Sequence, residues 1–504
     1  MCYKKYFLWL LFMAFFAAGN AQKNTADYHE KYRPQIHFSP QEHWTNDPNG
    51  MVYYHGVYHL FFQYYPDGTT WGPMHWGHAI SKDLVHWKQQ PIALFPDSLG
   101  YIFSGSAVVD KNNTSDFGKE GKVPLVAIFT QHDPVREKEG KTDFQNQSIA
   151  YSLDNGKTWT KYAMSPVLKN PGITDFRDPK VSWYEPEKKW VMTLATKDHV
   201  TFYSSLDLKN WKKESEFGKS LGAHGGVWEC PDLFPINYKG RKLWALLVSI
   251  NPGGPNKGSA TQYFIGDFDG KRFTTDDTTM KWIDYGPDDY AGVLWSNTGK
   301  RRIFLGWMSN WLYANVVPTQ RWRGAMTIPR DLGVEKIENE YYLTSTPVRE
   351  LEKLNTKSIV SKKDITANYS LSSKLLASPL RLSLRLNKVA DFSLTFKNDK
   401  DEKLVIGYKK GTKQFFIDRT KAGQTAFSKE FAGVAFAPRI SRDKHLQLTL
   451  IMDKTSVELF ADGGLTTMTE IFFPSGAMSQ LEIHSGKDVK INKFDVTALK
   501  SIWN

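Results

Sequence analysis

Three short segments of the chain each place an acidic residue just before a proline: residues 44–50, 176–179 and 228–231. The acidic residues are Asp47, Asp178 and Glu229. An apolar run follows each proline, and proline is tolerated at the first residue of a strand. We therefore expect the three carboxylates at positions where strands begin. Carboxylates that recur at one structural position can converge on a common mouth and perform paired acid and nucleophile chemistry.

The length and the net charge of the chain limit the number of domains and the kinds of binding partner that can be expected. Its 504 residues suffice for about two or three domains. The formal net charge is +12, but the basic residues are dispersed and no basic run is interleaved with aromatic residues. The pattern indicates a basic solvated surface and argues against nucleic acid as a partner.

The N-terminus has the pattern of a secretory signal. Two lysines precede an apolar stretch over residues 7–18, and small residues follow it. We predict a signal peptide over residues 1–21, cleaved before Gln22, and an exported protein that is periplasmic or extracellular. The stretch is shorter than the ~20 residues of a membrane-spanning helix, and no later segment is predicted to span a membrane. Cys230 then stands alone after loss of Cys2, which predicts no disulfide and a small buried packing residue.

A second pattern repeats through the first two thirds of the chain. Serine or glycine, aspartate and an aromatic residue recur in order at residues 81–87, 152–159, 205–211 and 266–273. Aspartate in a tight turn binds nearby backbone N–H groups, so we interpret these segments as turns rather than as sites. Repetition at such spacing is typical of propeller blades.

Between the acidic segments and these turns lie runs rich in valine, isoleucine and aromatic residues, which predict strands: residues 57–62, 125–130, 190–195, 243–250 and 303–308. Four-stranded blades would begin near Asn46, Phe103, Arg177, Glu229 and Asp289. The sequence thus predicts an all-β fold with a five-bladed β-propeller over residues 22–348. Because the innermost strand of each blade lines the central channel, the three carboxylates would lie around one end of it.

The amino-acid composition of the chain changes near residue 348. Residues 349–363 are rich in lysine and serine and are predicted to be a linker. Alternating apolar and polar residues over 392–396, 446–450 and 457–460 predict strands with one apolar face. We expect an antiparallel β-sandwich over residues 364–504 with a structural or accessory role.

These motifs resemble glycoside hydrolase family 32, the invertases, inulinases, levanases and related fructosidases. The resemblance covers nearly all of the chain after the signal peptide and is carried by residues 44–50, 61–64, 71–72, 75–78, 103–106, 176–179, 229–231, 306–308 and 458–464. It implies a five-bladed propeller plus a sandwich and retaining hydrolysis of β-fructofuranosides. One departure is Thr45, where methionine is commoner in the family.

The resemblance also implies a role for each carboxylate. Asp47 would attack the anomeric carbon of fructose, Glu229 would protonate the departing oxygen and then activate water, and Asp178 would hold ring hydroxyls. A retaining mechanism predicts about 5–5.5 Å between the carboxyls of Asp47 and Glu229. We further expect Arg177 to favour the charged form of Asp178 and to donate to sugar hydroxyls, and Glu229 to be partly desolvated and protonated.

Seven further residues are carried over from the family motifs as walls of a pocket for terminal fructose: Asn46, Gln63, Trp71, Phe103, Ser104, Arg177 and Trp307. No cofactor is expected. His75 and His78 could be read as metal ligands, but residues three apart on a strand point to opposite faces, so no metal site is predicted either.

The family motifs do not decide between levan, inulin, fructo-oligosaccharides and sucrose. Trp71 and the aromatic region of Trp295, Trp307 and Trp311 favour a closed pocket for one terminal sugar, and hence an exo-acting fructan β-fructosidase. The alternatives are an endo-acting levanase or inulinase and a fructosyltransferase. From another class, the chain could be a non-catalytic fructan-binding propeller with a lectin-like sandwich. The oligomeric state is left open.

Overall fold

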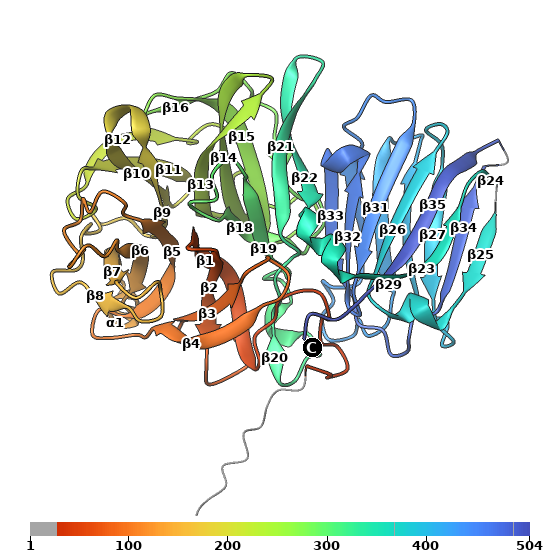
Figure 1. Ribbon diagram of the computed structural model, residues 1–504, viewed down its shortest axis with the longest axis horizontal. Helices are drawn as coiled ribbons and strands as arrows, with labels where there is room; N and C mark the ends of the chain where they lie inside the picture. Colours follow the sequence, from red (N-terminus) through yellow and green to blue (C-terminus); the bar gives the residue numbers. More distant parts are fainter. Residues whose placement is uncertain (1–27, 367, 487, 504) are drawn as a thin grey trace, which may run out of the picture.

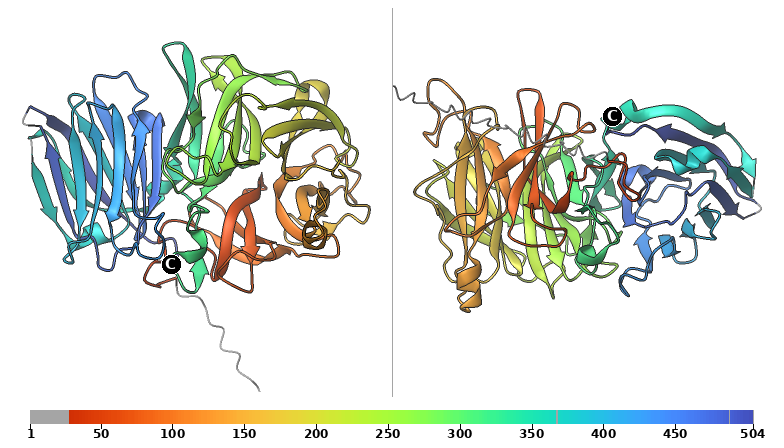
Figure 2. Two further views of the ribbon diagram at one scale, coloured as in Figure 1. Left: turned by 180° about the vertical axis from the view of Figure 1, so that it is seen from behind. Right: turned by 90° about the horizontal axis from the view of Figure 1, so that it is seen from below.

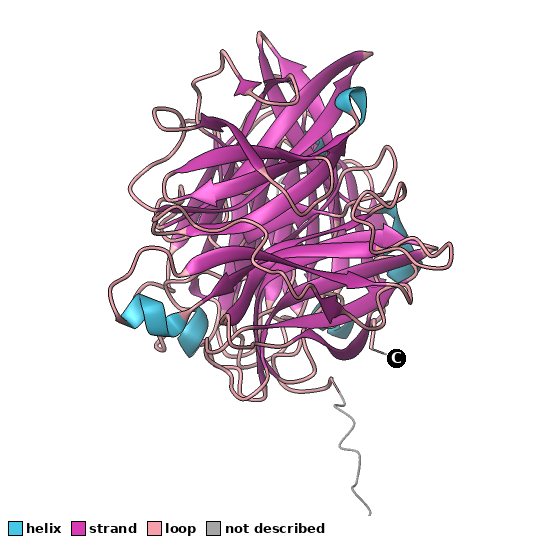
Figure 3. Ribbon diagram, turned by 90° about the vertical axis from the view of Figure 1, so that its left-hand side faces the viewer, coloured by secondary structure: helices cyan, strands magenta, loops and turns pink. Residues whose placement is uncertain are grey.

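A computed structural model of the protein describes residues 28–503 except 367 and 487. The predicted all-β class is confirmed, because strands dominate the described residues (Figure 3). The helical elements are short: α1 (Pro134–Lys138), η1 (Glu185–Glu187), η2 (Ala314–Val316), η3 (Arg349–Leu354), η4 (Lys374–Ala377) and η5 (Asp462–Gly464).

The N-terminal part of the chain forms five small sheets that follow one another in the sequence (Figure 1). The first has the strand order β20-β1-β2-β3-β4, with β1 (His43–Tyr54), β2 (Val57–Tyr65), β3 (His75–Ser81), β4 (Lys88–Leu94) and β20 (Trp322–Arg323). The second is β5 (Tyr101–Val109), β6 (Leu125–His132), β7 (Gln145–Ser152) and β8 (Thr160–Lys161). The third is β9 (Phe176–Tyr184), β10 (Lys189–Thr196), β11 (His199–Ser205) and β12 (Lys212–Phe217).

The fourth sheet contains β13 (Val227–Tyr238), β14 (Arg241–Asn251), β15 (Ala260–Phe268), β16 (Phe273–Thr274) and β17 (Lys281–Trp282). The fifth contains β18 (Tyr290–Leu294), β19 (Ile303–Trp307), β21 (Arg330–Ile337) and β22 (Glu340–Pro347). The apolar runs predicted as strands are the second strands of the five sheets, β2, β6, β10, β14 and β19.

Neighbouring sheets pack through hydrophobic clusters that connect the first sheet to the second, the second to the third, and so on to the fifth. A further cluster joins the fifth sheet back to the first, with Tyr290 and Ile303 packed near Leu60 and Phe62. The first strands also contact one another in cyclic order: β1 with β5, β5 with β9, β9 with β13, β13 with β18 and β18 with β1. Figure 1 shows these strands in the middle of the N-terminal part.

The repeated aspartates close turns, as predicted. Asp83, Asp154 and Asp207 each follow the third strand of a sheet and accept hydrogen bonds from backbone N–H groups two to four residues later. Asp269 does the same after β15. The repeat therefore forms the turns that follow the third strands of the first four sheets.

The C-terminal part consists of two larger sheets that face each other around one apolar core (Figure 2). One contains β23 (Asn355–Lys362), β24 (Ile365–Thr366), β26 (Leu380–Leu386), β31 (Leu446–Met452), β32 (Ser456–Ala461), β33 (Thr466–Ile471) and β35 (Lys490–Leu499). The other contains β25 (Tyr369–Ser372), β27 (Phe392–Lys397), β28 (Lys403–Lys409), β29 (Gln414–Lys421), β30 (Val434–Pro438) and β34 (Gln480–Ser485).

Residues 349–363, predicted to be a linker, instead form regular secondary structure. Its first part is the helical turn η3, in which Leu351 and Leu354 are buried, and its second part is β23, which pairs with β35. Lysine and serine occupy the exposed positions of an edge strand, where charged side chains are common. The composition of such a strand resembles that of a linker, which explains the wrong prediction.

The predicted signal peptide, residues 1–21, lies outside the described residues. Among the residues that the structure does describe, no helix combines the length and the apolar character that crossing a lipid bilayer requires.

Candidate active site

Each of the five first strands carries a β-bulge at an equivalent place, where two of its residues oppose one residue of the second strand. The two-residue steps are Asn46–Asp47, Phe103–Ser104, Asp178–Pro179, Cys230–Pro231 and Ala291–Gly292. Asp178, Cys230 and Ala291 have positive φ angles of 61°, 46° and 54°. The bulges interrupt the ladder and turn side chains that would otherwise alternate between the sheet faces.

This geometry corrects one expectation. The three prolines do not begin strands, because β1, β9 and β13 start two or more residues before the carboxylates. Proline is also found at bulges, where its missing N–H interrupts no ladder bond. The acidic and proline-containing segments thus mark bulges within the innermost strands.

Two of the three carboxylates, those of Asp47 and Asp178, contact Cys230, and the charge of the third, Glu229, acts on both of them. Its Sγ lies 3.6 Å from Asp47 Oδ2 and 3.6 Å from Asp178 Oδ2, and its backbone N–H donates to Asp178 Oδ2 at 3.0 Å. Glu229 is the residue before it in β13. Residues that are far apart in the sequence are therefore brought into one cluster, which we call the carboxylate cluster: Asp47, Asp178, Glu229 and Cys230.

Asp47 is held by two neighbours. Asn46 Nδ2 donates to Asp47 Oδ1 at 2.8 Å, and Ser104 Oγ donates to Asp47 Oδ2 at 2.8 Å. Asn46 is in turn fixed by Trp44, whose indole N–H donates to Asn46 Oδ1 at 2.8 Å. The carboxylate of Asp47 is thus oriented by side chains of the first and second sheets.

Glu229 lies between a cation and a phenol. Arg177 donates from Nε and Nη2 to Glu229 Oε1 at 3.2 and 3.0 Å, and the Tyr290 hydroxyl donates to Glu229 Oε2. Arg177 also pairs with Asp175. The side chain of Glu229 remains 20% exposed, so it is supported from within the protein and still open to a ligand.

The electrostatics of the cluster are dominated by burial. Burial raises the pKa of Asp47, and the neighbouring charge of Glu229 raises it further. Burial also raises the pKa of Asp178 to about 7; the charge of Arg177 opposes this shift, while those of Glu229 and Asp47 reinforce it. Three neighbouring acids cannot all be ionised without mutual repulsion, and the charge of Arg177 acts mainly on Asp178 and Glu229 rather than on Asp47. The cluster therefore holds protons at a pH where isolated carboxyls have lost them.

Arg177 acts on Asp178 through its charge. Burial raises the pKa of Asp178, and the charge of Arg177 lowers it, as expected, without cancelling the effect of burial. The guanidinium donates hydrogen bonds to Glu229 and Asp175.

Two of the residues predicted to line the pocket hold donors without partners. Gln63 Nε2 and Trp307 Nε1 are buried and have no hydrogen-bond acceptor within the described part of the chain. Gln63 lies opposite the Asn46–Asp47 bulge, and Trp307 pairs with Tyr290 across β18 and β19. Unpaired buried donors at this place are suited to hydroxyl groups of a ligand.

The two remaining predicted wall residues form a rim. Trp71 is 41% exposed and packs edge-on against Phe103 with ring centroids 6.2 Å apart. Phe103 stacks on His132 at 4.4 Å. Trp311 packs 4.9 Å from Trp307. Trp295 is different, because it is buried against Trp87 in the cluster between the first and fifth sheets and donates to His59 O.

Two residues of this site escaped prediction from the sequence. Tyr290 contacts Glu229, and Cys230 contacts Asp47 and Asp178, although Cys230 was predicted only to pack. The fifth blade was predicted to start near Asp289, and this position was the one feature that could have pointed to Tyr290 as a site residue. His75 and His78 have separate partners, Pro73 O and His59.

A separate cavity of about 490 Å³ lies along the later residues of the first strands, with Lys180, Asp232 and Leu294 in its lining. The carboxylate cluster does not line it. Lys180 and Asp232 form a buried ion pair there, 2.8 Å apart.

Comparison with known proteins identifies the family. The model of the glycosyl hydrolases family 32 N-terminal domain matches residues 37–347, and that of the family 32 C-terminal domain matches residues 348–498. The chain belongs to glycosyl hydrolase family 32 and is a glycosidase.

The chain is 45% identical to a levanase of Bacillus subtilis (strain 168) over 515 residues, which cover 99% of this chain and 74% of the levanase. It is 40% identical over 518 residues to an extracellular exo-inulinase of Aspergillus ficuum, covering 95% and 96% of the two chains. The crystal structure of exo-inulinase from Aspergillus awamori superposes with a TM-score of 0.88 at 37% identity, covering 94% of this chain and all of the other. A fructofuranosidase from Schwanniomyces occidentalis complexed with fructose has a TM-score of 0.85 at 31% identity and covers 95% and 99%.

Proposed function

We propose that this protein is a retaining β-fructosidase that releases terminal fructose from fructans and related β-fructofuranosides through a covalent fructosyl-enzyme intermediate. The proposal depends on the grouping of three acids: Asp47 and Asp178 both contact Cys230, and the charge of Glu229 acts on both of them. The similarity to a levanase and to exo-inulinases supports the substrate class.

In this proposal Asp47 is the nucleophile. Its carboxylate is oriented by Asn46 and Ser104, so one oxygen can face the anomeric carbon without rotating. Attack forms the fructosyl ester, and the departing oxygen must take up a proton at the same time. Fixing the carboxylate before the substrate arrives lowers the cost of reaching the transition state.

Glu229 is the proposed acid and base. It donates its proton to the leaving oxygen in the first step and removes a proton from water in the second, after which water opens the ester. Arg177 and Tyr290 hold its two oxygens, and its partial exposure leaves access for the leaving group and for water.

Asp178 is the proposed binder of the ring hydroxyls. A carboxyl with a pKa of about 7 can accept or donate a hydrogen bond near neutral pH. Gln63 and Trp307 would donate to further hydroxyls through their unpaired N–H groups, and Arg177 and Asn46 are proposed to line the same pocket. Trp71 and Phe103 would cover an apolar sugar face at the rim, which favours attack from the chain end.

The proposed architecture is a closed five-bladed β-propeller within residues 22–348 and a β-sandwich within the C-terminal part. The cyclic contacts of β1, β5, β9, β13 and β18, and the hydrophobic cluster between the fifth and first sheets, support closure. The pairing of β23 with β35 favours an earlier start for the sandwich than residue 364. We also propose export through a signal peptide over residues 1–21, in line with the extracellular exo-inulinases.

The test is a product analysis over time with levan, inulin and sucrose. The proposal predicts fructose as the only early product from the polymers. An early ladder of oligomers would indicate an endo-acting enzyme, and products longer than the substrate would indicate transfer. Binding of fructan without any product would favour the non-catalytic alternative.

A further inference from the structure

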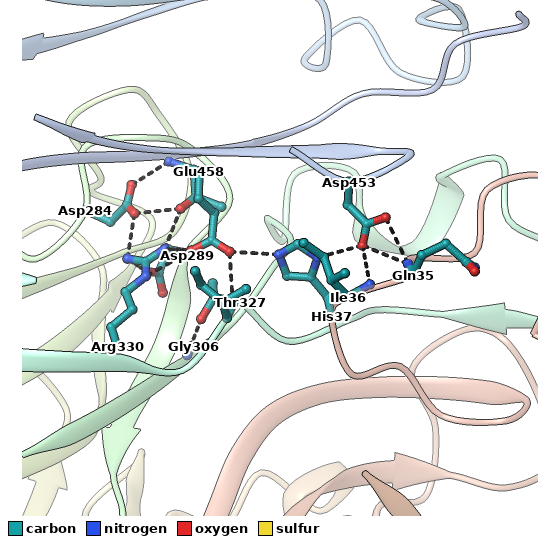
Figure 4. Close-up of polar contacts among 12 residues, drawn as sticks. Gln35, Ile36, His37, Asp284, Asp289, Gly306, Thr327, Arg330, Asp453 and Glu458 are labelled. Carbon is teal, nitrogen blue, oxygen red and sulfur yellow. Dashed lines mark hydrogen bonds and ion pairs between the residues drawn. The ribbon is translucent and has the colours of Figure 1, made fainter. Parts of the chain in front are cut away.

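A second buried set of charged residues lies where β32 and β33 meet the fifth sheet (Figure 4). We call it the interface network: Arg330, Asp284, Asp289, Glu458, Thr469, His37 and Asp453. The side chains of Arg330, Asp289 and Glu458 have no exposed surface. The network joins the N-terminal segment, the fifth sheet and the C-terminal sheets.

Arg330 is the centre of this network and uses all of its donors. Nε donates to Glu458 Oε2 at 3.0 Å, and Nη1 donates to Asp284 Oδ2 and Asp289 Oδ2, both at 2.9 Å. Nη2 donates to Thr469 Oγ1 at 2.7 Å and to Glu458 Oε2. Because a guanidinium has five N–H groups in one plane, these bonds fix both its place and its orientation.

The network reaches the carboxylate cluster through one peptide unit. Asp289 directly precedes Tyr290, whose hydroxyl donates to Glu229 Oε2. The second oxygen of Asp289 lies over Gly306, where a Cβ atom would be only 1.9 Å away. Gly306 directly precedes Trp307, the partner of Tyr290 across the sheet. Asp289 is thus enclosed between Arg330 and the strand that carries Trp307.

The remaining charges around Asp289 make Arg330 necessary for its position. Asp284 and Glu458 also face Arg330, and His37 bridges Glu458 and Asp453 with bonds of 2.8 Å to each. Four carboxyl groups therefore share two cationic groups. Without the guanidinium, Asp289 would lose its one hydrogen-bond donor among the described residues, whereas Asp284 would keep those of Thr469 and Gly286.

We propose that Arg330 is a positioning residue of the active site: by holding Asp289, it keeps the Tyr290 hydroxyl on Glu229, and the C-terminal sheets thereby help to set the geometry of the proposed acid and base. The inference rests on the proposed role of Glu229. Arg330 contacts none of the three carboxylates of the cluster, so its effect must pass through Asp289 and Tyr290.

A double-mutant cycle tests this path. Tyr290→Phe and Arg330→Lys are each expected to lower kcat for fructan about tenfold with little change in KM, because Glu229 loses the same orienting bond. In the double variant kcat is also expected to fall about tenfold, rather than about a hundredfold, because both substitutions remove the same bond to Glu229. Asp289→Asn, which keeps the side-chain shape, is expected to reproduce the loss if Arg330→Lys folds poorly.

Arg419→Lys is the matched control. Arg419 is also buried, and it joins β29 to the N-terminal part of the chain by pairing with Asp288 and Tyr313. This variant is expected to lower the melting temperature as Arg330→Lys does but to keep kcat within about twofold. Equal kcat losses in the two variants, or a multiplicative loss in the double variant, would overturn the inference.

A crystal structure of the Arg330→Lys variant supplies a readout that does not depend on activity. Separation of the Tyr290 hydroxyl from Glu229 is expected, and an unchanged contact would contradict the inference. If the wild-type protein releases no fructose, the proposed function fails, whereas this structural comparison still decides the path from Arg330 to Tyr290.

Discussion

The carboxylate cluster and the interface network are built from the same materials, buried acids around an arginine, but they differ in how their polar atoms are satisfied. In the cluster Glu229 is partly exposed, and the nearby donors of Gln63 and Trp307 have no partner. In the network every N–H of Arg330 is bonded, and Asp289 Oδ1 is the one member oxygen among the described residues that lacks a partner.

The difference shows what each region is suited to do. Buried polar groups that lack a partner cost stability unless a ligand supplies one, so the open donors of the cluster favour binding. Removing one partner from a buried ion network leaves uncompensated charge, so the bonds of Arg330 favour one arrangement of the elements around it. Changes in the cluster should therefore reduce activity. Changes in the network should reduce stability, and those at Arg330 and Asp289 should also lower kcat through Tyr290.

The largest expected effect is on activity. Asp47→Asn should lower kcat by about 10³-fold or more on every substrate, because no ester can form. Steady-state assays with sucrose and with an activated aryl fructoside measure this. Similar circular dichroism and melting temperature of the variant establish that the fold is intact, and substantial remaining activity would contradict the role of Asp47.

Glu229→Gln should separate the two substrates. We expect a loss of about 10³-fold with sucrose and a much smaller loss with the activated fructoside, whose leaving group needs no proton in the first step. The two kcat/KM values measure the difference. An equal loss on both would argue against Glu229 as the acid.

In the interface network, Arg330→Met should lower the free energy of unfolding by about 3–5 kcal/mol, because three buried acids lose their cation. Denaturant titration measures this loss. Arg301→Met is the comparison, since Arg301 pairs with Asp331 and Glu350 at a half-exposed position and should cost about 1 kcal/mol or less. Equal losses would show that burial of the network is irrelevant to stability.

The pH dependence of stability should also differ between the two regions. His37 has a pKa raised to about 9 through bonds to Asp453 and Glu458, which outweigh its burial. Its charged form therefore stabilises the fold fully below about pH 6.5, and this contribution is lost as the pH rises through about 9. His37→Gln should cost up to roughly 3 kcal/mol at pH 6, with a smaller cost at pH 9.5. Unfolding titrations at both pH values test the trend, and a cost that is constant with pH would contradict it.

Asp178 should also make stability fall with rising pH, but in a lower pH range, and here replacing the side chain should stabilise the protein. The pKa of Asp178 is raised to about 7 in the folded protein, so its carboxyl ionises at a lower pH in the unfolded chain than in the folded one. The free energy of unfolding of the protein therefore falls as the pH rises from about 4 to about 7. Asp178→Asn should therefore be more stable than the wild type by roughly 2–4 kcal/mol at pH 8 and nearly equal at pH 4. A destabilised variant at pH 8 would show that the ionised cluster is well compensated.

Much of the fold could be predicted because its signals are local. The valine-rich and aromatic runs identify β2, β6, β10, β14 and β19, and the aspartate turns mark where each third strand ends. The bulges could not be predicted, because a two-against-one pairing depends on the register of the neighbouring strand. The same holds for the pairing of Arg177 with Glu229, because the two residues are 52 positions apart in the chain.

The interface network was invisible in the sequence for another reason. His37, Asp284, Arg330 and Glu458 are far apart in the chain, and their spacing repeats nowhere. Two of its members have a place in the sequence prediction, Asp289 as the start of a blade and Glu458 within a family motif, and neither position predicts an ion pair. Tyr290 was missed because a single tyrosine at a strand start resembles a core residue.

The most direct test of the account is the configuration of a transfer product. With sucrose and methanol present, attack by Asp47 followed by methanol should give methyl β-fructofuranoside, which does not equilibrate between anomers and can be assigned by NMR. The account predicts this β-anomer from the first turnovers. Formation of the α-anomer would mean a single displacement and would contradict Asp47 as the nucleophile.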